Sequence, residues 1–413
     1  MRTSSIWRNK NFFYLIVGQT ISTFGSSITS LALPWLILDI TKSSLQMGLV
    51  VTLGIVPYLI LALPAGVWAD KYNRKKLMLI SNIGKTISIS LIPLAYFIFD
   101  DISIMLIYFV RVCMGIFDAI FDASYGACLP TIVSKDQLKQ GNSIMQTGIA
   151  ISTIAGPAVS GLLISLIGAA STIFLDVFTY IISVITLLII KSDFSVVKEK
   201  QIKDQRLIKD IVEGLIYIWN QRTVRFLTIL SLLANISSSL ILVVLIYRIN
   251  VELEVAAKWS GIIISGISIG ALIGSLSFAF ISRGFSFKQF TCFSLLLQAL
   301  SPFIIIFTNI PIIMMVGTVL FGISGVLWNI NVVSLRQTII PNTMLGRAGA
   351  SIKMVSIAST PVGSSLGGAL AQVFSSIIVF ILAGVINLMN FGAALNFPLT
   401  EKEDLINTKK EKG

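Results

Sequence analysis

The chain has 413 residues, of which 55% are hydrophobic and only 12% are charged, and its mean hydropathy is +0.89. Soluble domains carry about 25% charged residues, so the composition excludes an ordinary soluble protein and indicates an integral membrane protein. No histidine is present, which excludes histidine metal sites and Ser-His-Asp triads. We expect no enzymatic activity, no metal and no cofactor.

Twelve apolar runs are each long enough to cross a hydrocarbon core of about 30 Å. They lack the short alternating pattern of barrel strands, so we predict an all-α membrane protein. The first run is too long for a cleaved signal peptide. The predicted spans are 11–38, 45–69, 77–98, 103–128, 143–166, 171–191, 223–248, 260–282, 288–308, 311–335, 349–374 and 376–397.

Basic residues are distributed unevenly between the two sets of loops. Lysines and arginines gather in both tails and in alternate loops, whereas the opposite loops hold only Lys42, Arg248 and Lys258. The positive-inside rule then predicts a multi-pass protein of the bacterial cytoplasmic membrane with both termini cytoplasmic. The net charge of +12 is explained by this topology, so we expect the lipid bilayer and no nucleic acid as a partner.

Residues 192–222 separate two sets of six spans. This segment is polar at first and then amphipathic, with Leu207, Ile208, Ile211, Val212, Leu215 and Ile218 at helical spacing, which indicates a linker ending in an interfacial helix. We predict an N-terminal bundle at 1–191, a C-terminal bundle at 223–397 and a cytoplasmic tail at 398–413. Weakly similar segments in the two halves predict pseudo-symmetric six-helix bundles, an architecture of alternating-access transporters.

The loop "GVWADKYNRKK" resembles the Gly-x-x-x-Asp-Arg/Lys-x-Gly-Arg-Arg/Lys signature of the major facilitator superfamily, with Asn73 in the place of the last glycine. Asn tolerates a left-handed turn, so we expect the tight turn to persist. The resemblance implies that this loop is a conformational latch, whereas a plain positive-inside loop explains the basic residues equally well. The latch residues are Gly66, Asp70, Lys71, Arg74 and Lys75.

The fourth predicted span carries charges deep in the hydrocarbon. "RVCMG" resembles the superfamily's Arg-x-x-Gln-Gly motif, and Arg111, Asp118 and Asp122 lie within about 20° of one helical direction. Charges at this depth normally face a cavity or a partner, so these residues are candidates for proton coupling. Asp122 alternatively lies in water near the cytoplasmic end.

The fifth predicted span resembles the superfamily's exporter-type helix motif. "STIAGPAVSG" resembles the motif Gly-x-x-x-Gly-Pro-x-x-Gly-Gly at Gly156, Pro157 and Gly161, with Ser152 and Ser160 in the places of two glycines. Small residues recur at 148, 152, 156 and 160. A second stripe is Gly266, Gly270 and Gly274, and in the family these two helices face each other across the halves. Generic close helix packing is the alternative explanation of both stripes.

Longer stretches, such as "LPTIVSKDQLKQGNSIMQ", resemble the branch with the enterobactin exporter and macrolide efflux proteins. Many relatives carry an acidic residue where this chain has Ser26. This difference directs attention to Asp118 and to Asp176. The alternative for Asp176 is a structural hydrogen-bonding role near the outer face.

A substrate cavity is expected between the two halves. Bulky apolar walls with a few polar groups suit a large amphiphilic compound. The candidate lining residues, each of which alternatively has only a packing role, are Gln19, Ser22, Phe24, Phe117, Asn235, Ser238, Trp328, Asn329 and Asn331.

These observations predict a monomeric secondary transporter that exchanges protons for a lipophilic drug-like or siderophore-like small molecule. No phosphate-binding loop of the Gly-x-x-x-x-Gly-Lys-Ser/Thr type is present, which argues against direct use of ATP. Two alternatives stay open: an uptake permease of the same fold, and a membrane receptor or assembly subunit that transports nothing.

Overall fold

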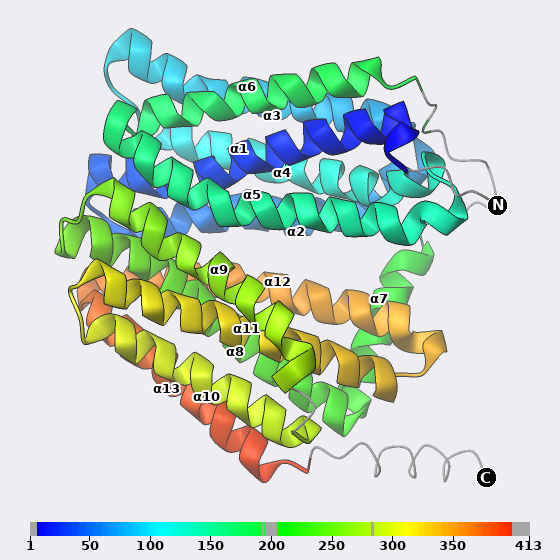
Figure 1. The fold of residues 1–413 in the computed structure, drawn as a ribbon, viewed down its shortest axis with the longest axis vertical. Helices are drawn as coiled ribbons and strands as arrows, with labels where there is room; N and C mark the ends of the chain where they lie inside the picture. The colour runs from blue at the N-terminus through cyan, green and yellow to red at the C-terminus, as the bar shows by residue number, and fades with distance from the viewer. Residues whose placement is uncertain (1–5, 192–193, 195–204, 282–284, 399–413) are drawn as a thin grey trace. The chain divides into compact units, whose positions relative to one another are not determined.

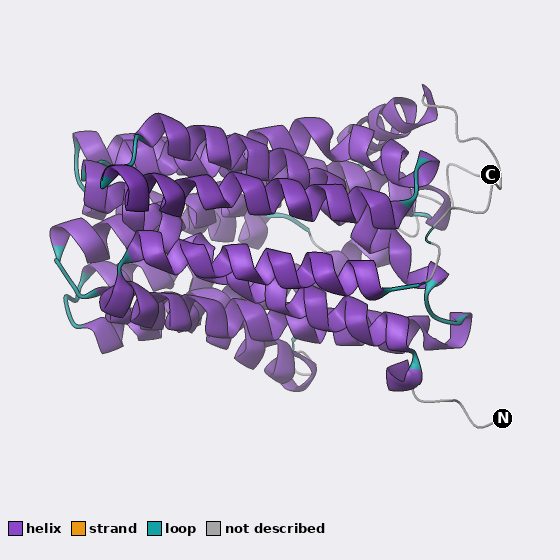
Figure 2. Ribbon diagram, turned by 90° about the horizontal axis from the view of Figure 1, so that it is seen from above, coloured by secondary structure: helices purple, strands orange, loops and turns teal. Residues whose placement is uncertain are grey.

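A computed structural model describes residues 6–191, 194, 205–281 and 285–398. These residues form helices and connecting loops, and none of them lies in a β-strand (Figure 2). The α-helices, labelled in Figure 1, are α1 (Lys10–Thr41), α2 (Ser44–Lys71), α3 (Arg74–Phe99), α4 (Ile104–Cys128), α5 (Leu138–Ile167), α6 (Ala169–Ile189), α7 (Gln205–Asn220), α8 (Arg222–Tyr247), α9 (Ala257–Ile281), α10 (Phe287–Ile306), α11 (Pro311–Ile339), α12 (Asn342–Val373) and α13 (Ser376–Asn396).

Each of the twelve predicted spans corresponds to one long helix, and α7 is the predicted amphipathic helix. Within the described residues, eleven helices are long and apolar enough to cross a membrane. α12 is as long as α1, at 32 residues, but it is rich in serine and glycine and carries Arg347 and Lys353. α12 is the predicted span that is not among these eleven helices, and the reason is its polar composition, because its length is sufficient.

The chain divides into two compact units. Unit 1 comprises Met1–Ile202 and Ile249–Ser265, and unit 2 comprises Lys203–Arg248 and Gly266–Gly413. This division differs from the predicted one because residues 249–265 group with the first six helices. The predicted linker at 192–204 (except residue 194), the tail residues 399–413 and the side chains of Leu207 and Ile208 lie outside the described residues.

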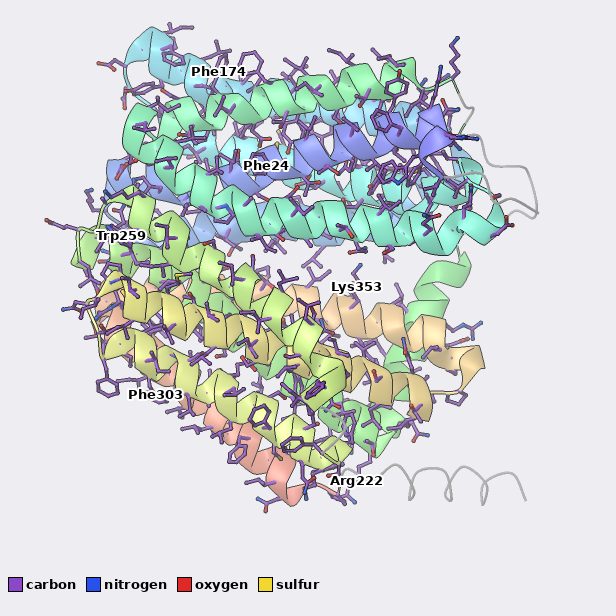
Figure 3. The ribbon with its side chains drawn as sticks, viewed as in Figure 1. Phe24, Phe174, Arg222, Trp259, Phe303 and Lys353 are labelled. Atoms are coloured by element: carbon purple, nitrogen blue, oxygen red, sulfur yellow. The ribbon has the colours of Figure 1, made fainter. Side chains whose placement is uncertain are left out.

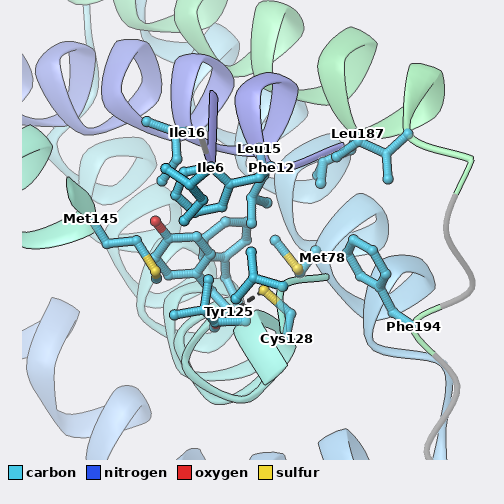
Figure 4. Close-up of a cluster of buried hydrophobic side chains, with 14 residues drawn as sticks. Ile6, Phe12, Leu15, Ile16, Met78, Tyr125, Cys128, Met145, Leu187 and Phe194 are labelled. Atoms are coloured by element: carbon cyan, nitrogen blue, oxygen red, sulfur yellow. Dashed lines mark hydrogen bonds between the residues drawn. The ribbon is translucent and has the colours of Figure 1, made fainter. Parts of the chain in front are cut away.

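In unit 1, α1 packs against α5 and α6, whereas α4 packs against α2 and α3. Fourteen buried apolar residues fill one end of this unit, where the start of α1 meets the ends of α4 and α6. Figure 4 shows Met78, Tyr125 and Met145 in this cluster, with the Cys128 thiol donating to the Tyr125 carbonyl oxygen at 3.1 Å. Cys128 is thus a packing residue in an apolar environment.

In unit 2, α8 packs against α12 and α13, and α10 packs against α11 and α13. One apolar cluster includes Leu227, Leu295 and Trp328. A second cluster joins Ile218 of α7 to Ile352 of α12. α7 is held further by a short Arg347–Glu213 ion pair and by the Ser351 hydroxyl, which donates to the Ile211 carbonyl oxygen at 3.1 Å.

Candidate functional site

The loop between α2 and α3 is tied to two neighbouring helix ends of unit 1. The Arg74 guanidinium donates to the Ala69 carbonyl oxygen at 3.0 Å and to the Ala127 carbonyl oxygen at 2.7 Å, and it pairs with Asp70 at 3.3 Å. The Lys75 ammonium donates to the Ile190 carbonyl oxygen at 2.6 Å. Basic side chains here therefore satisfy the open carbonyl groups at the ends of α4 and α6.

The backbone at Asn73 differs from the expectation of a left-handed turn. Its φ is −63° and its ψ is 115°, and its side-chain oxygen accepts from the Lys76 N–H at 3.2 Å. Asn73 is the N-cap of α3, which is the physical reason that a residue other than glycine fits there. Gly66 also lacks a crowded neighbour, because a Cβ atom placed on it would meet nothing within 4 Å.

Arg111 of α4 lies against α2. Its Nε donates to the Val50 carbonyl oxygen at 3.4 Å, and a Cβ atom on Gly54 would overlap its guanidinium group. One turn farther along α4, a Cβ atom on Gly115 would overlap the Gly54 carbonyl oxygen. Two glycines therefore allow α2 and α4 to approach closely and leave space for an arginine within the bundle.

Asp118 is paired with a lysine of α3. The Lys85 ammonium lies 2.9 Å from the Asp118 carboxylate, and the exposed fractions of the two side chains are 6% and 41%. The ammonium also lies 4.4 Å from the Phe121 ring centre and 5.2 Å from that of Tyr180. Lys85 is thus surrounded by one carboxylate and two aromatic faces, which attract a cation.

Asp122 is exposed at the residue level and accepts a hydrogen bond from the Tyr58 hydroxyl of α2. The predicted stripe of Arg111, Asp118 and Asp122 is therefore directed to different neighbours. Arg111 and Asp122 face α2, whereas Asp118 turns to Lys85 of α3.

Asp176 of α6 is fully buried between α1 and α6. It accepts hydrogen bonds from the Thr29 hydroxyl at 2.7 Å and the Thr179 hydroxyl at 2.8 Å. The Ser26 hydroxyl of α1 hydrogen-bonds the Tyr180 hydroxyl of α6 at 2.9 Å. The bond from Thr29 gives Asp176 a structural role, because it joins α1 to α6. Asp176 is also a buried carboxylate and therefore stays a candidate for proton coupling.

The small residues of α5 have two partners. Ser152 and Ser160 donate to carbonyl oxygens of α1, at 3.1 and 2.7 Å, and a Cβ atom on Gly156 would overlap Ser27. Gly161 instead meets the start of α9, where a Cβ atom would lie 2.8 Å from the Gly261 backbone. Pro157 lies on the same side, because a Cβ atom on Gly261 would overlap its carbonyl oxygen.

The second predicted stripe packs within unit 2. Cβ atoms on Gly266, Gly270 and Gly274 would meet Thr318, Val319 and Ile323 of α11. This stripe therefore packs on α11, and the contact of α9 with α5 within unit 1 uses Gly261, which precedes the stripe. Glycine spacing predicts close packing, but the tertiary structure decides the partner.

A cavity of about 580 Å³ lies within unit 2, among α8, α10, α11 and α12. Four of the predicted substrate-contacting residues line it, namely Asn235, Ser238, Trp328 and Asn329. Asn331 lies apart, because its amide donates to the Thr291 hydroxyl at 2.9 Å and to the Phe287 carbonyl oxygen at 3.3 Å. It joins α11 to α10.

The predicted substrate-contacting residues of unit 1 lie on α1 and α4. The Gln19 amide donates to the Thr23 hydroxyl at 3.2 Å within α1, and the Ser22 carbonyl oxygen accepts from Ser26. Phe24, labelled in Figure 3, is half-buried. Phe117 packs on α3, because a Cβ atom on Gly84 would overlap its ring.

Sequence reasoning missed several polar residues of these sites, among them Lys85, Gln298, Arg336 and Lys353. Lys85 lies in the middle of the third predicted span, so the rule that intramembrane charges have partners could have identified it. Arg336 directly follows the predicted end of the tenth span, where it looked like a loop residue. The structure extends this helix to Ile339 and thereby brings Arg336 into the bundle.

Residues 3–412 match the protein family described as "Transmembrane secretion effector". The multidrug efflux pump Tap of Mycolicibacterium fortuitum is 24% identical over 84% of this chain and 86% of its own length. The macrolide efflux protein A of Streptococcus pyogenes is 26% identical over 51% of each chain. The enterobactin exporter EntS of Shigella dysenteriae serotype 1 is 24% identical over 89% of this chain and 86% of its own length.

The fold also resembles that of solved transporters. The crystal structure of the nucleoside transporter NupG aligns with a TM-score of 0.77 at 13% identity, covering 94% of this chain and 100% of that chain. At this identity the likeness concerns the fold alone.

Proposed function

Because the chain belongs to the transmembrane secretion effector family, and is therefore a secondary transporter and not an enzyme, we propose that it exports a lipophilic or siderophore-like small molecule in exchange for protons. The family match and the efflux relatives confirm the predicted resemblance to the major facilitator superfamily and its exporter branch. The predicted all-α fold of twelve long helices is likewise confirmed.

The observation that carries the proton-coupling proposal is the Lys85–Asp118 ion pair inside unit 1. Protonation of Asp118 neutralises the carboxylate and leaves the buried Lys85 ammonium without its ion-pair partner, beside the Phe121 and Tyr180 rings. An unpaired charge in this environment is costly, so proton binding favours a different arrangement of α3 and α4. Asp118 is the more exposed partner and is the group that a proton can reach.

The energy available fits this mechanism. One elementary charge crossing about 100 mV releases roughly 2.3 kcal/mol, which corresponds to more than a tenfold concentration ratio. Leaving one partner of a fully buried ion pair without its counter-ion costs about 3–5 kcal/mol, which is of the same order, so a single proton can shift the balance between two conformations.

Arg111, Asp122 and Asp176 are further proposed participants, as groups that set the electrostatic environment of Asp118. We also assign the latch role to Gly66, Asp70, Lys71, Arg74 and Lys75, and the exporter-type helix contact to Ser152, Gly156, Pro157 and Gly161. The hydrogen bonds of Arg74 and Lys75 to the ends of α4 and α6 support the latch, since they hold this loop in a defined position on unit 1.

Transport is tested with purified protein in liposomes under an imposed pH gradient, using a compound that a deletion strain accumulates more than an overexpressing strain. We expect proton flux that depends on this compound. A deletion that lowers cellular content would instead identify an uptake permease, and absence of flux with every compound from the screen would identify a protein that does not transport.

We propose further that both termini face the cytoplasm and that the two six-helix halves act as the moving bodies of a monomer. Lys76 and Asp101 are both exposed and lie at opposite ends of α3. In a cysteine-free background, Asp101→Cys should react with an impermeant maleimide in intact cells, whereas Lys76→Cys should react only after the cells are opened. The reverse pattern would contradict the proposed orientation.

A further inference from the structure

The cavity of unit 2 carries an unbalanced positive charge. Its lining, as far as the structure describes it, contains two basic side chains, Arg336 and Lys353, and no acidic side chain. The volume of about 580 Å³ is in the range of small-molecule sites, which is about 300–1,000 Å³. The charge therefore needs a partner that the cavity wall itself does not supply.

Arg336 is anchored in this cavity but not neutralised. One of its terminal nitrogens donates to the Leu227 carbonyl oxygen and to the Ser231 hydroxyl, both at 2.9 Å. Its Nε is buried and has no hydrogen-bond partner among the described residues. A guanidinium group stays charged in proteins, and neutral acceptors do not compensate that charge in a spanning helix. Arg336 lines the cavity, so its uncompensated charge acts on whatever occupies the cavity.

Lys353 adds a second cation from another helix. Its side chain is exposed, projects from α12 (Figure 3) and makes no ion pair with a described residue. Arg336 comes from α11, so the two cations belong to different elements of the same wall. Two such charges favour a ligand with a compact anionic group.

The remaining wall suits the uncharged part of the same ligand. Trp328 and Val332 are almost fully buried and supply apolar surface. The Gln298 side chain is 3% exposed, and its amide donates to the Ser238 hydroxyl at 3.5 Å. Its side-chain oxygen has no hydrogen-bond partner within the part of the chain that the structure describes. The Gln298 oxygen is thus a second buried polar atom of the lining without a hydrogen bond, after the Arg336 Nε. A hydroxyl or amide N–H of a ligand would supply the missing donor.

We propose that this cavity binds the anionic group of an amphiphilic substrate, a carboxylate, sulfonate or phenolate, with Arg336 as its principal ion partner and Lys353 as the second. The inference rests on the proposed transport function, because it names the chemical class of the compound that is carried. Aromatic or aliphatic portions of the substrate lie on Trp328 and Val332. The same two charges disfavour a cationic amphiphile.

The test uses the full chain in phosphatidylcholine nanodiscs and two probes of the same shape, the carboxylate pyrenebutyrate and the neutral alcohol pyrenebutanol. A charge-assisted contact predicts that the carboxylate binds about tenfold more tightly than the alcohol. Arg336→Gln should remove most of this preference and leave the affinity for the alcohol within about twofold. Lys353→Gln should lower the preference by about threefold, and added salt should lower it further.

The matched control is Arg225→Gln. Arg225 lies on α8 of the same unit, and its guanidinium donates to the Trp219 carbonyl oxygen outside the cavity. The carboxylate preference should be unchanged in this variant. If Arg336→Gln does not fold, the wild-type ratio and the Lys353→Gln variant still decide the question.

Three results would overturn the inference. The wild-type chain could bind both probes equally, it could bind neither probe, or Arg336→Gln could lose affinity for both probes to the same extent. These outcomes are distinct from failure of the transport function. A clear carboxylate preference without proton flux in liposomes would refute transport and leave the anion site standing, whereas flux driven only by cationic compounds would refute the anion site alone.

Discussion

Replacing Asp118 by Asn tests the proposed coupling with little change in shape. The amide oxygen still accepts from the Lys85 ammonium, so the 2.9 Å contact persists while its ionic part is lost. An exposed ion pair contributes about 0–1 kcal/mol, and removing one partner of a fully buried pair costs about 3–5 kcal/mol. Lys85 is nearly fully buried and Asp118 is 41% exposed, so we expect an intermediate loss of about 2 kcal/mol in the free energy of unfolding.

The transport consequence is larger than the stability consequence. Asn does not bind or release a proton in the working range, so uphill transport of the compound should be abolished while membrane insertion and downhill exchange persist. The assay follows the pH inside liposomes and, separately, the exchange of labelled compound without a pH gradient. Lys85→Met combined with Asp118→Asn should recover stability relative to Asp118→Asn alone, because it removes the unpaired cation.

Asp100→Asn is the matched control for this change. Asp100 is an exposed C-cap of α3 with a φ of 53°, a conformation that Asn tolerates. Its transport should equal that of the wild type. Unchanged uphill pumping by Asp118→Asn would refute the assignment of Asp118 and would move the proton site to another carboxylate.

Three further substitutions test the packing and the latch. Gly115→Val should force α2 and α4 apart and lower the melting temperature by several degrees. Gly66→Ala should leave the melting temperature unchanged, because the space around Gly66 is open. Equal effects of the two substitutions would contradict the close approach of α2 to α4 at Gly115. Thr29→Val removes a donor from the buried Asp176 carboxylate and should cost about 1–3 kcal/mol of unfolding free energy, which Thr29→Ser should restore. Arg74→Gln should slow transport while protein levels in the membrane stay normal, and a wild-type rate would count against the latch.

The sequence predicted the positions of the spanning helices closely, because the lipid environment restricts the conformations of an apolar segment. A spanning segment must satisfy its own backbone, so an apolar run of sufficient length has one stable form. The predicted and observed bounds differ most at the starts of α5 and α12, where the helices extend beyond the apolar run. Polar helix ends outside the hydrocarbon carry no hydropathy signal.

Side-chain partners could not be predicted in the same way. The spacing of Arg111, Asp118 and Asp122 correctly indicates one helical direction, but α2 and α3 both border this face of α4. Asp118 pairs with Lys85, while Arg111 and Asp122 face α2. A helical wheel predicts which side of a helix a residue lies on, but it does not distinguish between two neighbouring helices that border the same side. A small rotation of a long side chain then changes its partner.

The sequence by itself determined a helical membrane transporter, its spans and the motifs of its family, because hydropathy and motif spacing are local properties of the chain. Only the tertiary structure decided that Lys85 neutralises Asp118, that Gly261 meets Gly161, and that Arg336 and Lys353 share a cavity without an acidic residue in its described lining. Each of these depends on the relative rotation and depth of two helices that are distant in sequence. That rotation is set by the packing of many side chains together, and no single segment encodes it.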